Sequence, residues 1–149
     1  MRIGWSLLVL AILATGCRRR EVIDVPEKQV ASDIPRALAM EDLRKLLPTA
    51  DYIAGTNPKE TYKASEVKSV EVGDKEVRVL PVKEKYPVLT AAYAQMTEVK
   101  LEKVGRYYYA RIFSTAQPEK GKDLLNFQWR NQEPAQQVVQ LLEALRVKK

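Results

Sequence analysis

Leu125-Asn126-Phe127-Gln128-Trp129-Arg130 alternates apolar and polar side chains without interruption. Successive side chains on a β-strand point to opposite faces, so this pattern predicts a strand with one face in the core, Trp129 included. Pro134 then opens a segment whose apolar residues recur at the spacing of one helical face, namely Val138, Leu141, Leu142 and Leu145. A half-buried strand followed by an amphipathic helix predicts an α+β domain with helices on one face of a sheet.

Two predicted hairpins precede this strand. In each, segments rich in β-branched or aromatic residues flank a short turn, Gly73-Asp74-Lys75 in the first and Val104-Gly105 in the second. The paired segments are residues 66–72 with 76–82, and residues 95–103 with 106–115. Residues 88–94 are compatible with either a strand or a helix. With the final strand, these segments predict an antiparallel sheet of about five strands built from hairpins.

An N-terminal helix is also expected before the sheet. Ser32 and Asp33 are suitable caps, Pro35 suits a first helical turn, and Pro48 ends the pattern. The apolar stripe between them is Ile34, Leu38, Leu43, Leu46 and Leu47. Residues 49–61 contain Gly55 and Asn57-Pro58 and are expected to form a loop. The sequence thus predicts one globular α+β domain over residues 32–149, flanked by an N-terminal and a C-terminal amphipathic helix.

The charge distribution argues against a nucleic-acid partner. The chain has a formal charge of +6, but Arg2 and the run at residues 18–20 carry much of it. Acidic and basic residues are nearly balanced in the remainder, and their signs alternate along the chain. A nucleic-acid-binding domain needs basic side chains gathered on one face. A solvated surface of mixed charge is the simpler expectation.

The residue inventory excludes most catalytic and metal sites. The chain has no histidine and a single cysteine, so Ser-His and Cys-His pairs and the usual zinc ligand sets cannot form. No glycine-rich phosphate loop or run of calcium ligands is present. We therefore expect no enzymatic activity, no cofactor and no metal. Hydrolysis by two carboxylates alone stays open.

Residues Leu13-Ala14-Thr15-Gly16-Cys17 resemble the processing site of bacterial lipoproteins. Met1-Arg2 and the apolar residues 3–14 before them have the form of an export signal, and this core is shorter than the roughly 20 residues that span a bilayer. The resemblance implies cleavage between Gly16 and Cys17 and attachment of lipid, with acyl chains such as palmitate, to Cys17. Ala14-Thr15-Gly16 also suits an ordinary signal peptidase, and a chance cysteine after an apolar run is a third interpretation.

This resemblance divides the chain into a signal peptide at residues 1–16, a lipidated tether at 17–31 and the domain. It implies a protein attached to a membrane by lipid, and attached to the outer membrane facing the periplasm if the host has two membranes, because Arg18 rather than Asp follows the cysteine. Basic residues beside an anchor are attracted to anionic headgroups. Arg18, Arg19 and Arg20 therefore either contact the membrane surface or form a solubilising linker, and they weigh against easy export.

Candidate contact residues lie in Arg106-Tyr107-Tyr108-Tyr109-Ala110-Arg111-Ile112-Phe113. On a strand, Tyr107, Tyr109, Arg111 and Phe113 share one face, and the residues between them share the other. The row of aromatic and arginine side chains has two interpretations. One is a partner or ligand contact through Tyr107, Tyr108, Tyr109 and Arg111. The other is a sheet with one face in the core and a solvated tyrosine on the other, because strands favour tyrosine in any case.

Together these observations predict a lipid-anchored, non-enzymatic protein of the cell envelope that acts through protein contacts, as an accessory or assembly component. The alternative is an envelope binding module for an amphiphile or a glycan. Nothing in the sequence names the partner or ligand.

Overall fold

The computed structural model describes residues 20–25, 34–57, 59–114 and 123–146. The described part confirms an α+β fold with antiparallel strands and two α-helices. The prediction of one sheet with about five strands is wrong, because the described strands form one sheet of six and another of three.

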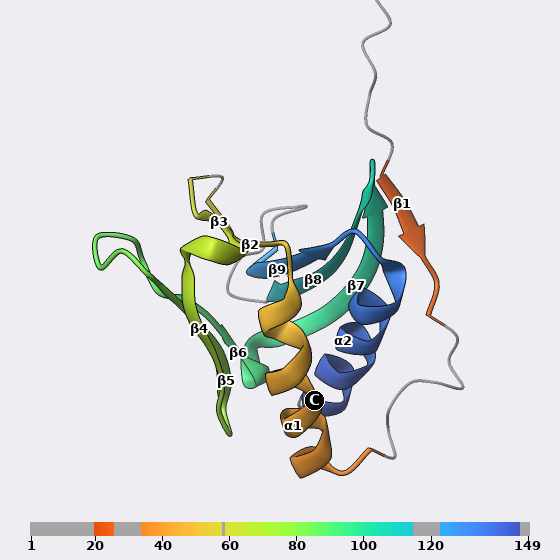
Figure 1. Ribbon diagram of the computed structural model, residues 1–149. Helices are drawn as coiled ribbons and strands as arrows, with labels where there is room; N and C mark the ends of the chain where they lie inside the picture. The colour runs from red at the N-terminus through yellow and green to blue at the C-terminus, as the bar shows by residue number, and fades with distance from the viewer. Residues whose placement is uncertain (1–19, 26–33, 58, 115–122, 147–149) are drawn as a thin grey trace, which may run out of the picture.

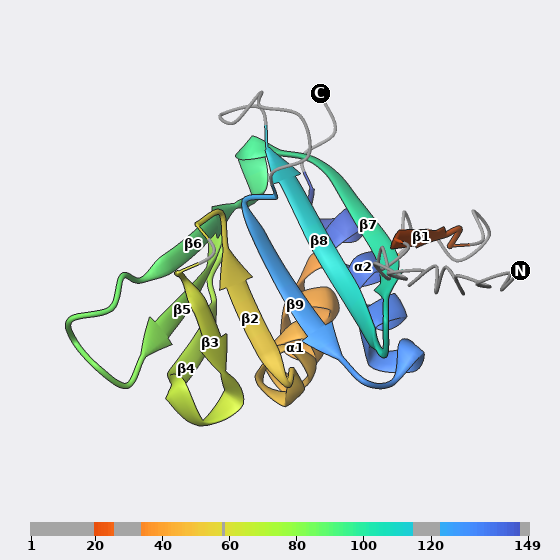
Figure 2. The ribbon, with the colours of Figure 1, turned by 90° about the horizontal axis from the view of Figure 1, so that it is seen from above.

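The larger sheet contains the second predicted hairpin and the final predicted strand. Its order is β1-β7-β8-β9-β2-β3, and Figure 2 shows the face that the helices leave uncovered. The strands are β1 (Arg20–Ile23), β7 (Met96–Val104), β8 (Tyr107–Ser114), β9 (Leu125–Trp129), β2 (Tyr52–Gly55) and β3 (Thr61–Lys63). Gly105, in the turn between β7 and β8, has a φ of 61°, a conformation that glycine adopts at little cost.

The smaller sheet contains the first predicted hairpin. It joins β4 (Val67–Val72), β5 (Glu76–Pro81) and β6 (Leu89–Ala92) in that order. A 3-10 turn, η3 (Ala64–Glu66), separates β3 from β4, so the chain enters a second sheet instead of extending the first. The ambiguous segment 88–94 forms β6 and the start of a further 3-10 turn, η4 (Tyr93–Gln95).

Both helices lie on the same face of the six-stranded sheet, and α1 also lies beside the smaller sheet (Figure 1). They are α1 (Arg36–Leu46), continued by the 3-10 turn η2 (Leu47–Thr49), and α2 (Gln132–Leu145). The whole predicted stripe of α2 is buried, from Val138 to Leu145. Arg44 of α1 donates to the carbonyl oxygen of Val72 at 2.9 Å and so attaches the helix to β4.

The stripe predicted for α1 is partly wrong. Leu43 and Leu47 are fully buried, but the side chain of Leu38 is 52% exposed. Ala39 and Met40 face the core instead, because the helix begins at Arg36 after Pro35 and its buried line runs at intervals of three and four residues. The predicted caps Ser32 and Asp33 lie outside the described residues.

Two segments expected to lack structure contain strands. The predicted loop 49–61 contains β2, whose Ile53 is buried between Phe127 on β9 and Tyr62 on β3. The predicted tether 17–31 contains β1, whose residues Arg20 to Ile23 pair with the edge of β7. Tertiary pairing therefore orders short segments that carry little periodicity of their own.

One hydrophobic core joins the two sheets and both helices. Leu101, Ala110 and Phe127 form a cross-strand row on the covered face of the six-stranded sheet, and each is almost completely buried. Val138 and Leu142 of α2 belong to the same core, both fully buried. No helix in the described part of the chain is long and apolar enough to cross a membrane.

Candidate functional site

The register of β8 divides its side chains between the two faces of the six-stranded sheet. Ala110 and Ile112 are fully buried on the helix side, and Tyr108 packs partly buried against the same core. Tyr107, Tyr109, Arg111 and Phe113 therefore lie on the opposite face, which we call the outer face. The division matches the predicted alternation, and it separates Tyr108 from the other candidate contact residues.

Arg111 lies within a network of charges on the outer face, and it is only 6% exposed. Its Nη1 donates to Glu102 Oε2 at 2.7 Å, and its Nε and Nη2 donate to the two carboxylate oxygens of Asp123 at 3.1 and 3.2 Å. Burial lowers the pKa of Arg111, but the hydrogen bonds to Asp123 and Glu102 outweigh it and raise that pKa above its ordinary value. Arg111 therefore remains charged and joins three segments of the fold.

Two amides extend this network across β9. Asn126 Nδ2 donates to Asp123 Oδ2 at 2.7 Å, and Gln128 Nε2 donates to Asn126 Oδ1 at 2.8 Å. The chain of hydrogen bonds runs from Glu102 on β7 to Gln128 on β9 and fixes the side chains that form the middle of the outer face. Sequence reasoning identified Arg111 but missed Asp123, Asn126 and Gln128, because only the strand register brings them together.

Beside the network lies an open hollow of about 620 Å³, which we call the tyrosine hollow. Its lining combines three tyrosines, an arginine and uncharged polar groups. The residues are Tyr52, Thr61, Val104, Gly105, Arg106, Tyr107, Tyr109 and Gln128. The rings of Tyr52 and Tyr107 meet edge to face, with centroids 5.6 Å apart. The hollow is thus an aromatic surface with hydrogen-bonding groups at its edges.

Two arginines flank Tyr107 at the rim of the tyrosine hollow. The Arg106 guanidinium lies 5.4 Å from the centroid of the Tyr107 ring. A hydrogen bond with Arg130 lowers the pKa of the Tyr107 hydroxyl below its ordinary value. Arg130 also donates its backbone N–H to Asp51 Oδ2 at 3.0 Å. These contacts give the rim a positive character and hold the ring of Tyr107 in place.

A smaller hollow of about 100 Å³ lies over the charged network and reaches Arg20 of β1. Arg20 is exposed, and its strand is paired with β7. Of the three arginines predicted to contact a membrane, only Arg20 is described. Arg18, Arg19 and the predicted processing residues Gly16 and Cys17 lie outside the described residues.

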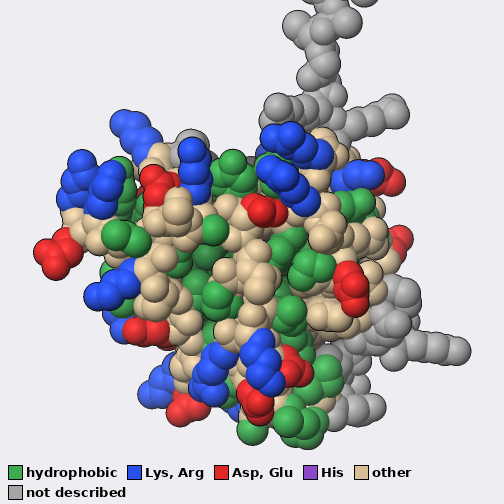
Figure 3. All heavy atoms as spheres, viewed as in Figure 1, with side chains coloured by type: hydrophobic (Ala, Val, Ile, Leu, Met, Phe, Trp, Pro, Cys, Tyr) green, Lys and Arg blue, Asp and Glu red, His purple; other side chains and the backbone are tan. Residues whose placement is uncertain are grey.

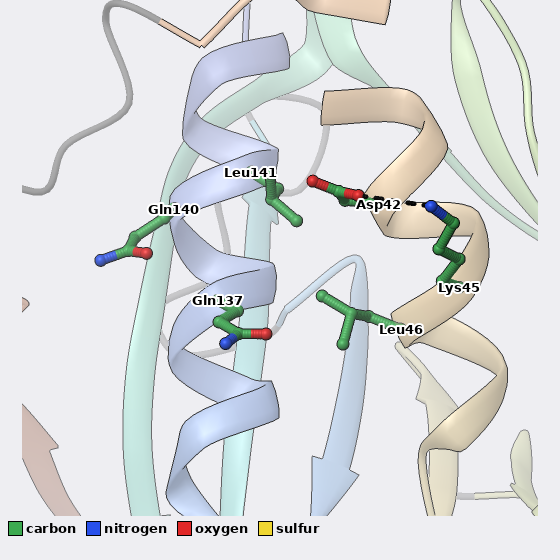
Figure 4. A pocket seen from close by; sticks show the side chains of 6 residues that line it. All are labelled: Asp42, Lys45, Leu46, Gln137, Gln140 and Leu141. Carbon is green, nitrogen blue, oxygen red and sulfur yellow. Dashed lines mark ion pairs between the residues drawn. The ribbon is translucent and has the colours of Figure 1, made fainter. Parts of the chain in front are cut away.

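A separate groove of about 360 Å³ lies on the helix side of the molecule, between α1 and α2 (Figure 4). Asp42, Lys45 and Leu46 line it from α1, and Gln137, Gln140 and Leu141 line it from α2. Lys45 Nζ lies 3.8 Å from Asp42 Oδ1 across an exposed pair. Figure 3 views this helix side and shows apolar surface at its centre with charged side chains toward the edges. The groove thus combines one exposed ion pair with two glutamines and an apolar strip formed by Leu46 and Leu141.

The described residues contain no group of three or more His, Cys, Asp or Glu side chains that could hold a metal ion. No family model matches the sequence, and neither a curated protein nor a solved structure matches it. The functional argument therefore rests on the geometry of the outer face.

Proposed function

We propose that this is a lipid-anchored, non-enzymatic protein of the cell envelope that acts through protein contacts, and that the tyrosine hollow is its contact surface. The observation that supports this most is the grouping of Tyr52, Tyr107 and Tyr109 beside Arg106 on the outer face. Tyrosine and arginine contribute more binding energy at protein interfaces than most residue types.

The charged network beside the tyrosine hollow supports the same function. Tyr109 stands between Arg111 and Tyr107 along β8, and Glu102 and Gln128 lie directly opposite Tyr109 on the neighbouring strands. Both neighbours belong to the hydrogen-bonded network. Because these neighbouring side chains are held by hydrogen bonds, the aromatic rings can contact a partner with little loss of side-chain entropy on binding.

The carboxylates of the outer face are better suited to structure than to catalysis. Glu102 and Asp123 both accept hydrogen bonds from the single guanidinium of Arg111, which lies between them. Glu102 Oε2 and both carboxylate oxygens of Asp123 are engaged by Arg111, whereas carboxylate catalysis needs two acids that face a substrate between them. This arrangement supports the proposal of a non-enzymatic protein.

A glycan ligand is the second candidate, and the amide of Gln128 favours it. Gln128 lines the hollow together with Tyr52 and Tyr109, so that aromatic rings and an amide are available side by side. Sugars are bound by this combination, because their rings stack on aromatic faces while their hydroxyls need hydrogen-bonding partners. An enclosed site for an amphiphile has less support, since the interior between sheets and helices is filled by buried side chains.

Site-specific photo-cross-linking separates these candidates. A photoreactive phenylalanine analogue replaces Tyr109 in the full chain, and the matched control carries it at Tyr86, a half-buried tyrosine on the loop between β5 and β6. A protein partner predicts a defined adduct with an envelope protein at position 109 and none at 86. Identical adduct patterns at both positions would contradict the protein-contact proposal.

The glycan candidate predicts a different result. Wild-type protein is retained on purified envelope polysaccharide, and the Tyr52→Ala/Tyr109→Ala variant is not, whereas Tyr86→Ala behaves as wild type. If the probe at position 109 forms no specific protein adduct and the double variant is retained on polysaccharide like wild type, the tyrosine hollow is not the contact surface. Labelling with a fatty-acid analogue tests the anchor separately, and label that persists in Cys17→Ala would refute it.

A further inference from the structure

The six-stranded sheet has charges of opposite sign at its two ends. One end contains the start of β1, the β7–β8 turn, the end of β9, the start of β2 and the end of β3. The basic residues at this end are Arg20, Lys63, Lys103, Arg106 and Arg130, and the acidic ones are Glu21, Asp51, Glu66 and the buried Glu102. We call this the basic end. At the other end the described strand termini carry Asp24, Glu60 and Asp123, with Lys59 as the basic residue.

The basic end is also where the described chain begins. Arg20 is paired with Val104, next to the β7–β8 turn, so β1 starts beside Arg106. Figure 1 shows the start of β1 and the β7–β8 turn together at the top of the molecule. Figure 3, in the same view, shows Lys and Arg side chains gathered at that edge.

The distance to the predicted anchor is short. Cys17 precedes Arg20 by only three positions in the sequence. Three residues span at most about 10 Å, whatever their conformation. Charges at a membrane surface act over a similar distance, because the Debye length at physiological salt is about 8 Å. Lipid on Cys17 would therefore bring the basic end, and no other end of the sheet, within the field of the headgroups.

We propose that the domain docks through its basic end on a bilayer containing anionic lipid, with the outer face standing beside the membrane surface. This inference rests on the lipid anchor of the proposed function. Arg20 and Arg106 are exposed and meet the headgroups at the turn, and Arg130 adds charge at the end of β9. Tyr107 lies among these arginines, and amphipathic tyrosine rings favour the membrane interface.

Docking in this orientation gives the tyrosine hollow a defined position. The hollow shares Arg106 and Tyr107 with the basic end, so it would open next to the headgroups and not toward the bulk of the compartment. A partner that binds there would itself have to lie close to the membrane.

The test is fluorescence quenching of the mature lipoprotein in vesicles that contain headgroup-labelled quencher lipid. A fluorophore is attached to a cysteine at exposed Asn131, beside Arg130, or at exposed Lys75 in the distant β4–β5 turn. Vesicles of phosphatidylcholine are compared with vesicles that also contain phosphatidylglycerol. We expect quenching at position 131 in the anionic vesicles, with much less at position 75, and a decrease at high salt.

The decisive variant is Arg20→Gln/Arg106→Gln/Arg130→Gln. Each cation near an anionic surface strengthens the attraction by about fivefold, so the triple variant is expected to lose most of the quenching at position 131. The control variant Lys45→Gln/Lys68→Gln/Lys85→Gln removes the same number of charges from exposed positions elsewhere. It is expected to keep the quenching at position 131. Equal quenching at positions 131 and 75, or equal quenching in both triple variants, would overturn the docking.

Flotation with the vesicles separates this proposal from the anchor itself. If the lipidated chain floats with the vesicles but shows no quenching at position 131, the docking is refuted and the anchor is supported. If the chain carries no lipid, floats only with anionic vesicles and floats less as the Arg20→Gln/Arg106→Gln/Arg130→Gln variant, the docking is supported and the anchor is refuted. A chain that carries no lipid and floats with neither kind of vesicle refutes both.

Discussion

Arg111 on β8 forms its shortest ion pair with Glu102 on β7, at 2.7 Å, although the two residues are not directly opposite each other. The register places Lys100 opposite Arg111, and like charges in that relation destabilise a sheet. Lys100 instead directs its ammonium toward Glu98, at 3.2 Å, and lies over the ring of Phe113. The diagonal pairing of Arg111 with Glu102 therefore removes a repulsion that the strand register would otherwise impose.

Replacing Arg111 with methionine tests this arrangement. Methionine retains the flexible apolar stem but carries no charge, so the buried Glu102 and the largely buried Asp123 would be left without their common partner. Loss of one partner from a buried charge cluster costs about 3–5 kcal/mol, and we expect a decrease of this size in the free energy of unfolding, measured with urea.

Neutralising the two acids provides the control. Arg111→Met combined with Glu102→Gln and Asp123→Asn is expected to recover about 1–2 kcal/mol relative to Arg111→Met alone, because amides tolerate burial better than unpaired carboxylates. A cost below about 1 kcal/mol for Arg111→Met would show that the network contributes little to the stability of the outer face.

The contact between the two helices and the core gives a second prediction. Leu142 is fully buried on α2, whereas Leu38 on α1 is 52% exposed. We expect Leu142→Ala to lower the free energy of unfolding by about 2–5 kcal/mol and Leu38→Ala to change it by less than about 0.5 kcal/mol. Similar losses for the two variants, in the same urea titration, would contradict the helix orientation described above.

Alkaline pH gives a third prediction, through Tyr93. Burial raises the pKa of Tyr93 to about 12 from its ordinary value of 10.0. The unfolded chain therefore loses this proton at lower pH than the folded protein, and the free energy of unfolding falls as the pH rises from 10 toward 12. The decrease attributable to Tyr93 is up to about 2 kcal/mol. Tyr62, whose pKa burial also raises, contributes in the same direction.

The variant Tyr93→Phe isolates this contribution. It removes the hydrogen bond that the hydroxyl donates to the Gly73 carbonyl oxygen at 3.1 Å, so we expect a loss of about 1 kcal/mol at neutral pH. Its stability should then decline less steeply than that of wild type above pH 10. Parallel pH profiles for the two proteins in urea titrations would show that Tyr93 does not titrate with the raised pKa.

The β7–β8 turn gives a fourth prediction. A Cβ atom at Gly105 would meet nothing within 4 Å, so only the backbone conformation opposes a side chain there. Gly105→Ala is expected to cost about 1 kcal/mol, and Gly105→Asn less, because asparagine tolerates positive φ. Gly73→Ala is the matched control at the other hairpin, where φ is not positive, and it should stay within about 0.5 kcal/mol of wild type by thermal unfolding.

The sequence predicted those elements whose apolar residues repeat with the period of a strand or a helix. The alternation at residues 125–130 became β9, and the apolar stripe after Pro134 became α2. β2 was missed because its four residues are too few to show a period and are followed by a turn signal. β1 was missed for a similar reason, since Arg20 to Ile23 are mostly exposed and are ordered only by pairing with β7.

The candidate site, like the fold, was predictable only where a local pattern determines the direction of the side chains. Alternation along β8 placed Tyr107, Tyr109 and Arg111 on one face, because side-chain direction on a strand follows from position alone. Tyr52 comes from the predicted loop 49–61, and Asp123 comes from a segment for which no element was predicted. Their approach to β8 depends on strand order and register, which local patterns do not encode.

The pairing of β1 with β7 also determines how the domain would respond to a mechanical load. Tension on the N-terminal chain acts at Arg20, which is the terminal residue of the β1–β7 ladder. Force at the end of a ladder separates its pairs one after another, so resistance stays small at every step. The four residues of β1 would detach at a lower tension than is needed to unfold the helices and the core. If the proposed lipid anchor holds the chain, a pull from the membrane would thus detach a strand that can pair again, while the rest of the domain stays folded.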